Sequence, residues 1–411
     1  MNALDILKER GFVQQCSNEN GLRALFSRAK VVYYAGFDPT ADSLHVGHLI
    51  PIMAMANLQR AGHTPIIIIG GGTALIGDPS GKTEMRRIIT REEIARNIAK
   101  LLPQFKRYLE IGNGKGTLFD NADWLAGLNY IEFLRDIGRH FKVNEMIRNE
   151  GYRLRLERKE GLSFIEFNYQ LLQAYDFLVL FERHGCILQV GGDDQWGNIL
   201  AGINLVRQVK REVVYALTFP LITTASGQKM GKTETGAIWL DATRTSPYNF
   251  YQYWINVDDR DVIRFLKMFT FLSMEKINEL AKLQGADIRK VKEILAYETT
   301  KLAHGEEEAK KARKTAGAAF AKTEEDSSGL PTTVVSETRI AEGIPVVDLF
   351  FEAGLAPSKG TARRLIEQGG AYVNDQKITA TDAVIKRDVF RNNACIIRHG
   401  KKQQHRIVIG D

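Results

Sequence analysis

The apolar positions of the chain gather first into short runs that are typical of buried strands. VVYYAGF (31–37) and PIIII (65–69) contain no polar alternation, as expected for strands that are covered on both faces. Residues 46–59 between them have helical spacing, and the short links of this strand, helix and strand indicate parallel pairing. Residues 187–190, a glycine pair and a helix over 198–208 repeat the unit. The pattern predicts an α/β fold with a doubly wound parallel sheet and ligands at the carboxyl ends of its strands.

The same patterning divides the rest of the chain. We expect one domain over residues 1–245, with a mostly helical insertion at about 115–185 between the two halves of the sheet. Helical spacing continues through 246–321, which predicts an all-α domain. The mixed polar stretch 322–342 lacks periodicity and is interpreted as a linker. Residues 343–411 are expected to form a small α+β domain, in which an Asn-Asp pair between β-prone residues predicts a hairpin.

Length and cysteine usage narrow the class of protein. The chain has 411 residues, which exceeds the size at which one hydrophobic core usually stops growing. Its three cysteines are far apart, so neither a disulfide framework nor a zinc site is indicated. No apolar run reaches membrane-spanning length, and the first residues lack the pattern of a signal peptide. We therefore expect a cytoplasmic protein that has no membrane partner and no tightly bound metal.

The net charge of +7 is concentrated near the C-terminal end. Residues 357–411 hold 11 Lys and Arg against 5 Asp and Glu, a difference of +6. Positive charge clustered in a small segment is typical of nucleic-acid binding, although a solvated basic surface is a common alternative. On the short helix predicted in this segment, Lys359, Arg363 and Arg364 are the candidate RNA contacts.

Two histidines lie where the first strand has turned and the first helix begins. In HVGH (45–48), backbone N–H groups and two imidazoles would converge on a site suited to phosphate. The glycine between them would let a nucleotide approach closely. Alone, the tetrapeptide could equally be two ordinary histidines at a helix start. Asp38 and Thr40, at the carboxyl end of the preceding strand, favour ligand binding.

A second candidate for polyphosphate binding is KMGKT (229–233), which follows a much later apolar strand. Two lysines, a small residue and a hydroxyl suit a mobile clamp on phosphates, while a solvated basic loop is the alternative. GDPSGKT (77–83) ends like a P-loop but has three residues between its glycines instead of four, and it contains Asp-Pro. We reject a P-loop and interpret Asp78 as a carboxylate available to a substrate ammonium.

A polar face is expected on the helix that begins with the capping box SFIE (163–166). Tyr169, Gln173 and Asp176 are four and three residues apart and therefore share one side of that helix. The side is either solvated or turned inward as a compact polar pocket. In the second case Asp176 could accept a hydrogen bond from a phenol, with Tyr34 supplying the complementary hydroxyl from the first strand.

In their order along the chain, these segments resemble the bacterial tyrosyl-tRNA synthetases, a family of class I aminoacyl-tRNA synthetases. The resemblance lies in YYAGFDPTADSLHVGHL, LIGDPSGK, FNYQLLQAYDF, QVGGDDQWGNI and KMGKT. PSKGTARRLIEQGGAYVNDQKI near the end is similar to an S4-type RNA-binding domain. The resemblance implies a Rossmann-like catalytic sheet, an S4-like C-terminal domain and a homodimer. It also implies L-tyrosine, ATP with Mg²⁺ and tRNA(Tyr) as substrates and partners, in a reaction that passes through tyrosyl-adenylate.

The resemblance implies a role for each matching residue. Those that would hold tyrosine are Tyr34, Asp78, Tyr169, Gln173, Asp176 and Gln195. Those that would bind ATP are Gly36, Asp38, Gly47, Gly192, Asp194 and Lys232. Those expected to act in catalysis are Thr40, His45, His48, Lys229, Lys232 and Thr233.

The chain departs from the family pattern at a few positions. Val46 stands where Ile is familiar, and the lysine motif has Met230 and Gly231, which are conservative changes. Asp193 stands where serine is often found and is expected to add a carboxylate beside the site.

Two other functions are compatible with parts of the pattern. A tryptophanyl synthetase or another class I nucleotidyltransferase would share the histidine and lysine motifs, but Tyr34 together with Asp176 argues against it. An RNA-binding protein that kept a synthetase fold for a structural role would not need both catalytic motifs, and this chain has both.

Overall fold

The computed structural model describes residues 2–80, 89–157, 161–225, 227, 230–233, 236–317, 329–400 and 403–410. The chain forms two compact units. The first comprises Met1–Met230 with Ile263–Ile277, and the second comprises Gly231–Val262 with Asn278–Asp411. Within the described residues, no helix combines the length and the apolar character that a membrane span requires.

A six-stranded sheet in the order β1-β6-β5-β2-β3-β4 forms the centre of the first unit. Its strands are β1 (Gln15–Cys16), β2 (Val32–Phe37), β3 (Thr64–Ile69), β4 (Thr117–Asp120), β5 (Cys186–Gly192) and β6 (Tyr215–Phe219). All neighbouring pairs are parallel except β1 with β6. The strand order reverses between β2 and β5, so the expected binding crevice lies at the carboxyl ends of these two strands. The doubly wound parallel sheet predicted from the sequence is confirmed, and the short antiparallel strand β1 is an addition to it.

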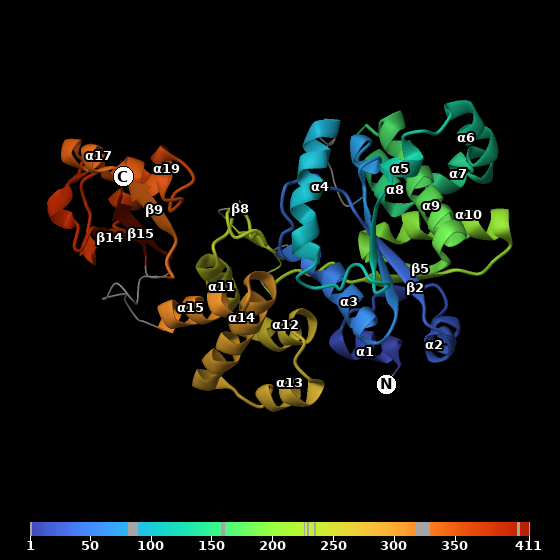
Figure 1. The fold of residues 1–411 in the computed structure, drawn as a ribbon, viewed down its shortest axis with the longest axis horizontal. Coiled ribbons are helices and arrows are strands. Elements are labelled where there is room, and N and C mark those ends of the chain that lie inside the picture. The colour runs from blue at the N-terminus through green and yellow to red at the C-terminus, as the bar shows by residue number, and fades with distance from the viewer. Residues whose placement is uncertain are drawn as a thin grey trace. The chain divides into compact units, whose positions relative to one another are not determined.

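Helices cover both faces of this sheet (Figure 1). The alternation of side chains along β2 shows which helix covers which face. The Tyr33 hydroxyl donates a hydrogen bond to the Met55 carbonyl on α3 (Leu49–Arg60), at 2.5 Å. The next side chain, Tyr34, packs edge-on against Phe177 of α9 (Phe164–His184), with ring centroids 5.3 Å apart. Tyr34 therefore points to the side of the sheet that α9 covers.

Short helices fill the segment between the two halves of the sheet. They are α5 (Ala122–Leu125), α6 (Tyr130–Asp136), α7 (Val143–Met146) and α8 (Glu150–Glu157), followed by α9. The capping box predicted at the start of α9 is present, because Ser163 and Glu166 bond to each other's backbone N–H groups. The expected insertion started at about residue 115, but β4 belongs to the main sheet, so the helices begin only after Asp120.

Other helices of the first unit are α1 (Ala3–Arg10), α2 (Glu19–Arg28), α4 (Arg91–Phe105) and α10 (Trp196–Lys210). Helices also follow Ser246, as predicted: α11 (Pro247–Ile255), α12 (Val262–Phe269), α13 (Met274–Leu280), α14 (Ile288–His304) and α15 (Glu306–Gly317). The structure divides them differently from the expected all-α domain, because Ile263–Ile277 belongs to the first unit. Buried Arg10 explains part of this division. Its guanidinium donates to the carbonyls of Lys267, Thr270 and Leu272, at 2.8, 3.0 and 2.7 Å.

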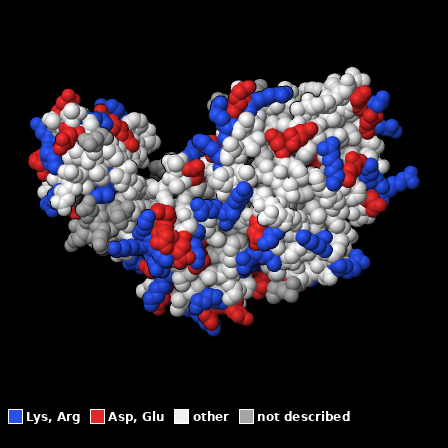
Figure 2. Space-filling view, in the orientation of Figure 1, with Lys and Arg blue, Asp and Glu red and all other residues white. Residues whose placement is uncertain are grey.

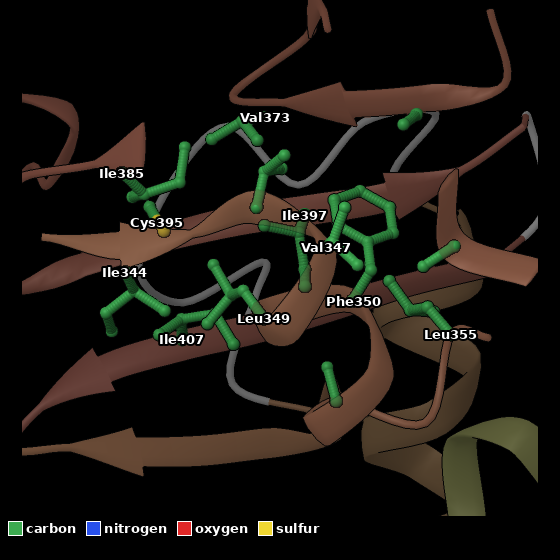
Figure 3. Packing of buried hydrophobic residues seen from close by; sticks show 14 of the residues in the cluster. Ile344, Val347, Leu349, Phe350, Leu355, Val373, Ile385, Cys395, Ile397 and Ile407 are labelled. Carbon is green, nitrogen blue, oxygen red and sulfur yellow. The ribbon is translucent and has the colours of Figure 1, made fainter. Parts of the chain in front are cut away.

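The C-terminal part is built on a five-stranded sheet in the order β12-β11-β14-β15-β9. Its strands are β9 (Thr332–Val335), β11 (Ala371–Val373), β12 (Gln376–Lys377), β14 (Ala394–His399) and β15 (Gln403–Ile409). Three helices pack with it: α17 (Glu337–Glu342), α18 (Val346–Glu352) and α19 (Lys359–Glu367). β10 (Ile344–Pro345) and β13 (Val384–Ile385) form a separate small pair. Figure 3 shows Phe350, Ile397 and Ile407 within one apolar cluster, together with the thiol of Cys395.

Two sequence predictions can be compared with this C-terminal part. The predicted hairpin is confirmed: β11 and β12 pair antiparallel, and Asn374 and Asp375 between them have φ values of 45° and 67°. Of the stretch 322–342, expected to be a linker, residues 322–328 lie outside the described residues, and the described remainder contains β9 and α17. β9 is held by parallel pairing with β15, more than sixty residues later, and this partner leaves no local signal in the sequence.

Candidate active site

The two histidines of the HVGH motif form a compact pair above the sheet. The Gly47 N–H donates to His45 Nδ1 at 3.0 Å, and the His45 N–H donates to His48 Nδ1 at 3.1 Å. Their rings lie 4.0 Å apart between centroids. Burial lowers the pKa of His48 to about 3, and the neighbouring His45 adds to this effect. His48 is therefore a neutral imidazole at physiological pH, and with Nδ1 accepting, its Nε2 carries the proton and can donate it to a ligand.

Gly47 is required by the packing of this pair. A Cβ atom at this position would lie 2.8 Å from His45 Cε1 and 2.9 Å from His45 Nδ1. The carbonyl oxygen of Met230, from the lysine motif, would be 3.7 Å from the same Cβ. The histidine motif and the first described residue of the lysine motif thus lie close together within the first unit.

Asp38 follows β2 and is held by side chains from two other segments. Its Oδ1 accepts from the Thr73 hydroxyl at 2.9 Å, and its Oδ2 accepts from the Tyr169 hydroxyl at 3.1 Å. The Thr40 N–H donates to the Asp38 carbonyl at 2.8 Å, which makes a tight turn after the strand. The structure thus brings Asp38 and Tyr169, predicted from separate motifs, into direct contact.

Asp78 belongs to a polar network that crosses the switch point of the sheet. Its Oδ2 accepts from Gln195 Nε2 at 2.8 Å, and its Oδ1 accepts from the Ser80 N–H at 2.9 Å. Asn198 Nδ2 lies 3.1 Å from Gln173 Oε1 and 3.4 Å from Gln195 Oε1. These hydrogen bonds connect three predicted residues, Asp78, Gln173 and Gln195. Asn198, which connects Gln173 and Gln195, was not predicted from the sequence.

The Asp176 carboxylate is buried deeper on α9, with 4% of the residue exposed. It accepts from Trp124 Nε1 at 2.7 Å and from Asn121 Nδ2 at 3.0 Å. Burial raises the pKa of Asp176 to about 7, and nearby Asp38 and Asp120 raise it further, whereas the two hydrogen bonds oppose the rise. The polar side of α9 is therefore turned toward the protein interior and not toward solvent.

Tyr34 has a buried hydroxyl without a hydrogen-bond partner among the described residues. Only 1% of the residue is exposed. Burial raises the pKa of Tyr34 well above its ordinary value, and the charge of Asp176 raises it further. The hydroxyl therefore stays protonated, and it can both donate and accept a hydrogen bond. A ligand hydroxyl beside Asp176 and Tyr34 would supply a partner.

Sequence reasoning missed the residues that orient Asp176. Asn121 is 1% exposed and also bonds Thr73 Oγ1 at 3.1 Å and the Gly72 N–H at 2.8 Å. Asn121 and Trp124 come from the turn that follows β4 and from α5, where single polar residues produce no periodic signal. A separate cavity of about 420 Å³ lies beside this turn, and none of the predicted site residues lines it.

The glycines predicted to face ATP differ in their surroundings. Gly36 is exposed, and a Cβ there would meet nothing within 4 Å, which leaves open space above β2. A Cβ at Gly192 would lie 2.6 Å from Asp194 Oδ1, so this side chain packs back over the end of β5. The Asp193 carboxylate, expected beside the site, accepts from Gln15 Nε2 and Thr218 Oγ1 at 2.7 and 2.8 Å. It is therefore engaged at the β1–β6 edge of the sheet.

The lysine motif is described only in part. Lys229 lies outside the described residues, as do the side chains of Lys232 and Thr233. The backbone of the last two forms β7 (Lys232–Thr233), which pairs antiparallel with β8 (Gly236–Ala237). The motif is thus the start of a small hairpin.

The predicted RNA-contacting residues share the exposed side of α19. Lys359, Arg363 and Arg364 are all exposed, and Lys359 pairs with Asp348 at 2.8 Å between Nζ and Oδ1. Figure 2 shows acidic as well as basic side chains on the visible face of this C-terminal part. The described residues contain no cluster of His, Cys, Asp or Glu that could hold a metal ion.

Two family models match the chain. Residues 27–321 match the class I tRNA synthetases (W and Y), and residues 323–407 match the tyrosine–tRNA ligase SYY-like C-terminal domain. A tyrosine–tRNA ligase of Desulfosudis oleivorans is 53% identical over 429 residues, covering 100% of this chain and 99% of the relative. One from Acetivibrio thermocellus is 53% identical over 406 residues and covers 99% of each chain.

Solved structures agree with these matches. A C-terminally truncated mitochondrial tyrosyl-tRNA synthetase of Aspergillus nidulans has a TM-score of 0.70 at 32% identity, covering 78% of this chain and 94% of that chain. A tryptophanyl-tRNA synthetase of Encephalitozoon cuniculi bound to tryptophan has a TM-score of 0.56 at 14% identity, covering 79% and 89%, and shows the shared fold alone. The chain belongs to the tyrosine–tRNA ligases of the class I aminoacyl-tRNA synthetase family.

Proposed function

We propose that this chain activates L-tyrosine with ATP and then transfers the tyrosyl group to the 3′-terminal ribose of tRNA(Tyr). The observation that supports tyrosine as the substrate is the buried Tyr34 hydroxyl. This hydroxyl lacks a partner among the described residues, and the charge of Asp176 raises its pKa. A tyrosine phenol placed here would donate to Asp176 and accept from Tyr34. Tryptophan offers an indole N–H but no oxygen to accept from Tyr34.

Activation requires positioning more than a protein nucleophile. The tyrosine carboxylate attacks the α-phosphorus of ATP, the bond to the β-phosphate bridge breaks, and pyrophosphate leaves with its electron pair. A ribose hydroxyl of tRNA then attacks the acyl carbon, and AMP leaves. We assign Thr40, His45, His48, Lys229, Lys232 and Thr233 to the transferring phosphates. Donors of this kind lower the barrier by stabilising charge that develops in the transition state.

The ammonium of tyrosine would be held by the network around Asp78. Asp78 supplies the carboxylate, and Tyr169, Gln173 and Gln195 supply neutral groups, of which Gln195 donates directly to Asp78. A phenylalanine in the same place would leave the Tyr34 hydroxyl without a partner among the described residues and would offer no donor to Asp176. Such groups are expensive to leave without partners, so selection against phenylalanine follows from the pocket itself.

ATP binding is assigned to the open end of β2 and to the start of α10. Gly36 leaves room for the nucleotide, and we assign its contacts to Gly36, Asp38, Gly47, Gly192, Asp194 and Lys232. Mg²⁺ would arrive with ATP and be held mostly by phosphate oxygens and water. Its charge would help to neutralise the leaving pyrophosphate.

The C-terminal part would bind tRNA(Tyr). The charge excess near the end of the chain supports this role, as do the exposed side chains of Lys359, Arg363 and Arg364 on α19. Contacts to phosphates position a protein on RNA and weaken as salt rises. We place the reaction in the cytoplasm, where three unpaired cysteines are expected to stay reduced.

We further propose that the enzyme is a homodimer in which the inserted helices contact a second copy. Among the described residues, eight of the fourteen large hydrophobic side chains that are exposed lie between residues 130 and 165. They are Tyr130, Ile131, Leu134, Val143, Ile147, Leu156, Phe164 and Ile165. A concentration of exposed apolar side chains marks an interaction surface, and a two-fold axis would pair it with itself.

Sedimentation equilibrium tests the dimer. Ile131 is 70% exposed, and Ile131→Glu should shift the mass to that of a monomer because it places a charge within the apolar surface. Val213 is 68% exposed outside this segment, and Val213→Glu is the matched control that should remain dimeric. A monomeric wild-type chain at micromolar concentration would contradict the proposal.

Exchange of labelled pyrophosphate into ATP tests the activity, with tyrosine, phenylalanine and tryptophan compared in the absence of tRNA. Exchange with tyrosine alone is the expected result. Exchange that depends on tryptophan would overturn the specificity. Folded protein without exchange would favour the alternative of an RNA-binding protein that kept the synthetase fold.

A further inference from the structure

We propose that Tyr253 is a positioning residue for the activation step, because its hydroxyl fixes the backbone of the lysine-motif loop from which Lys232 and Thr233 follow. Tyr253 lies on α11, and the sequence analysis assigned no role to it. The inference rests on the role proposed above for the lysine motif. It concerns how the loop is held, which the motif residues themselves do not explain.

The hydrogen bonds of Gly231 carry the argument. Its N–H donates to the Tyr253 hydroxyl oxygen at 3.2 Å, and its carbonyl accepts from the Ile238 N–H at 2.9 Å. Gly231 is buried and has a φ of 77°, a conformation that residues with a Cβ rarely adopt. Both polar groups of this backbone unit are therefore satisfied, one by the hairpin and the other by a side chain from a helix.

The position of Gly231 makes its conformation important for the lysine. β7 begins at the next residue, and there Lys232 pairs with Ala237 and Thr233 with Gly236. The dihedral angles of Gly231 set the backbone direction at the start of this short hairpin. A two-residue strand pair has little stability of its own, so an external anchor matters more here than in a long hairpin.

α11 gives Tyr253 a rigid base. The helix is capped by Ser246, whose side chain accepts from the Asn249 N–H, and Trp254 on the same helix is fully buried. The Tyr253 ring packs edge-on against Trp254, with centroids 5.2 Å apart. Burial raises the pKa of Tyr253 to about 12, with the Gly231 N–H opposing and Asp261 reinforcing the rise. The hydroxyl therefore stays neutral throughout the working range of pH.

Removal of this hydroxyl would leave the buried Gly231 N–H without its acceptor. The loop would then spend more time in other conformations in which that N–H reaches water. Only the fraction of molecules with the loop in place could stabilise the leaving pyrophosphate, so the observed rate falls by that fraction. From the usual penalty for a buried donor that loses its partner, we expect a decrease of about tenfold.

The test is a single-turnover measurement of tyrosyl-adenylate formation in the full-length enzyme. Tyr253→Phe should lower the rate constant about tenfold, while the dissociation constant for tyrosine stays unchanged. Tyr248→Phe is the matched control. Tyr248 is buried on the same helix, but its hydroxyl bonds to Gln252 within that helix, so this variant should keep the full rate.

Two further variants separate this inference from the role of the motif. Lys232→Ala should lower the rate by itself, and Tyr253→Phe should then have little additional effect, because both changes remove the same interaction. A full rate in Lys232→Ala would overturn the proposed role of the lysine motif. A low rate in Lys232→Ala with a full rate in Tyr253→Phe would overturn the role of Tyr253 alone.

Hydrogen exchange tests directly whether the Tyr253 hydroxyl anchors the Gly231 backbone, while the rate measured against the tyrosine dissociation constant tests the effect on catalysis. In Tyr253→Phe, the amide of Gly231 should exchange faster than in the wild type, while amides in the core of α11 keep their protection. Equal protection of the Gly231 amide in both proteins would contradict the inference, even if the rate had fallen.

Discussion

At the scale of single residues, the proposed tyrosine site depends on side chains whose partners come from distant parts of the chain. Asp176 was predicted from its spacing on α9, but its donors Asn121 and Trp124 follow β4. Spacing along one helix predicts which residues share a side, yet it cannot predict which other segment will face that side. Asp193 illustrates this limit, because its carboxylate bonds to Gln15 and Thr218 at the edge of the sheet.

The raised pKa of Asp176 predicts that tyrosine binding depends on pH. Burial raises this pKa to about 7, so acidification below that value protonates the group that would accept the phenol hydrogen. The affinity for tyrosine should be full about one unit or more above pH 7, halve near pH 7, and fall about tenfold for each further unit well below it. Equilibrium dialysis across this range measures the effect.

The matched ligand for this experiment is phenylalanine. It has no hydroxyl to donate, so its weak binding should not decline at low pH. In Asp176→Ala, the preference for tyrosine over phenylalanine should shrink sharply. A dissociation constant for tyrosine that is flat with pH, or a preference that survives in Asp176→Ala, would refute the assignment. The same shift should make the unliganded fold lose stability as the pH rises towards 7, because the native state holds this proton more tightly than the unfolded chain.

The packing of Gly47 predicts a selective loss of catalysis. In Gly47→Ala, the new methyl would press against the His45 ring, and the ring would move from its hydrogen bond. We expect the activation barrier to rise by about 2 to 3 kcal/mol with little change in tyrosine affinity, measured in a single turnover. Gly127→Ala is the control, since a Cβ there meets nothing within 4 Å. A normal rate in Gly47→Ala would argue against a role for the histidine geometry.

At the scale of elements, long apolar runs and local turn chemistry were predictable, and short strands were not. The buried strands β2 and β3, the capping box of α9 and the hairpin at Asn374 each have a local physical cause. β1 has only two residues, and its partner β6 lies about two hundred residues later. β9 is similar, because Thr332–Val335 becomes a strand only through β15. Such strands form because they pair with strands far along the chain, and the residues around them give no sign of this pairing.

The link between α1 and α12 predicts a strong effect on stability. Arg10 satisfies three carbonyls in the last turn of α12 and just after it, so Arg10→Met would remove the donors while keeping much of the side-chain volume. We expect the free energy of unfolding to fall by about 2 to 3 kcal/mol, measured by urea denaturation. Arg23→Met removes a surface ion pair with Asp5 and should change stability little. Equal effects of the two changes would contradict this account of Arg10.

At the scale of the whole molecule, hydrophobic periodicity predicted the helices that follow Ser246 and the mixture of strands and helices near the C-terminal end. The structure shows that contacts do not follow chain order strictly. Ile263–Ile277 joins the first unit although it lies within the helical stretch after Ser246. The hydrogen bonds between Arg10 and the end of α12 explain part of this arrangement. The sequence alone does not show which segment a buried arginine will bond to.

The C-terminal part should fold alone. Its apolar cluster runs from Val335 to Ile409 and contains 21 buried residues, all from this part of the chain. A fragment of residues 329–411 should therefore unfold cooperatively on heating, as measured by circular dichroism. The chain ending at residue 317 should keep tyrosine-dependent pyrophosphate exchange but lose most aminoacylation. A fragment without a cooperative transition, or a truncated chain with full aminoacylation, would contradict this separation of roles.

The buried Tyr34 hydroxyl has a consequence for evolution. The Tyr34 hydroxyl has no partner among the described residues, and a buried polar atom of this kind destabilises the empty protein, so Tyr34→Phe should raise the unfolding temperature of the unliganded enzyme. Saturating tyrosine should remove or reverse this difference, which a thermal melt with and without the amino acid would measure. Selection for thermostability alone would thus favour phenylalanine at this position. Only selection to exclude the wrong amino acid from the genetic code would retain the tyrosine.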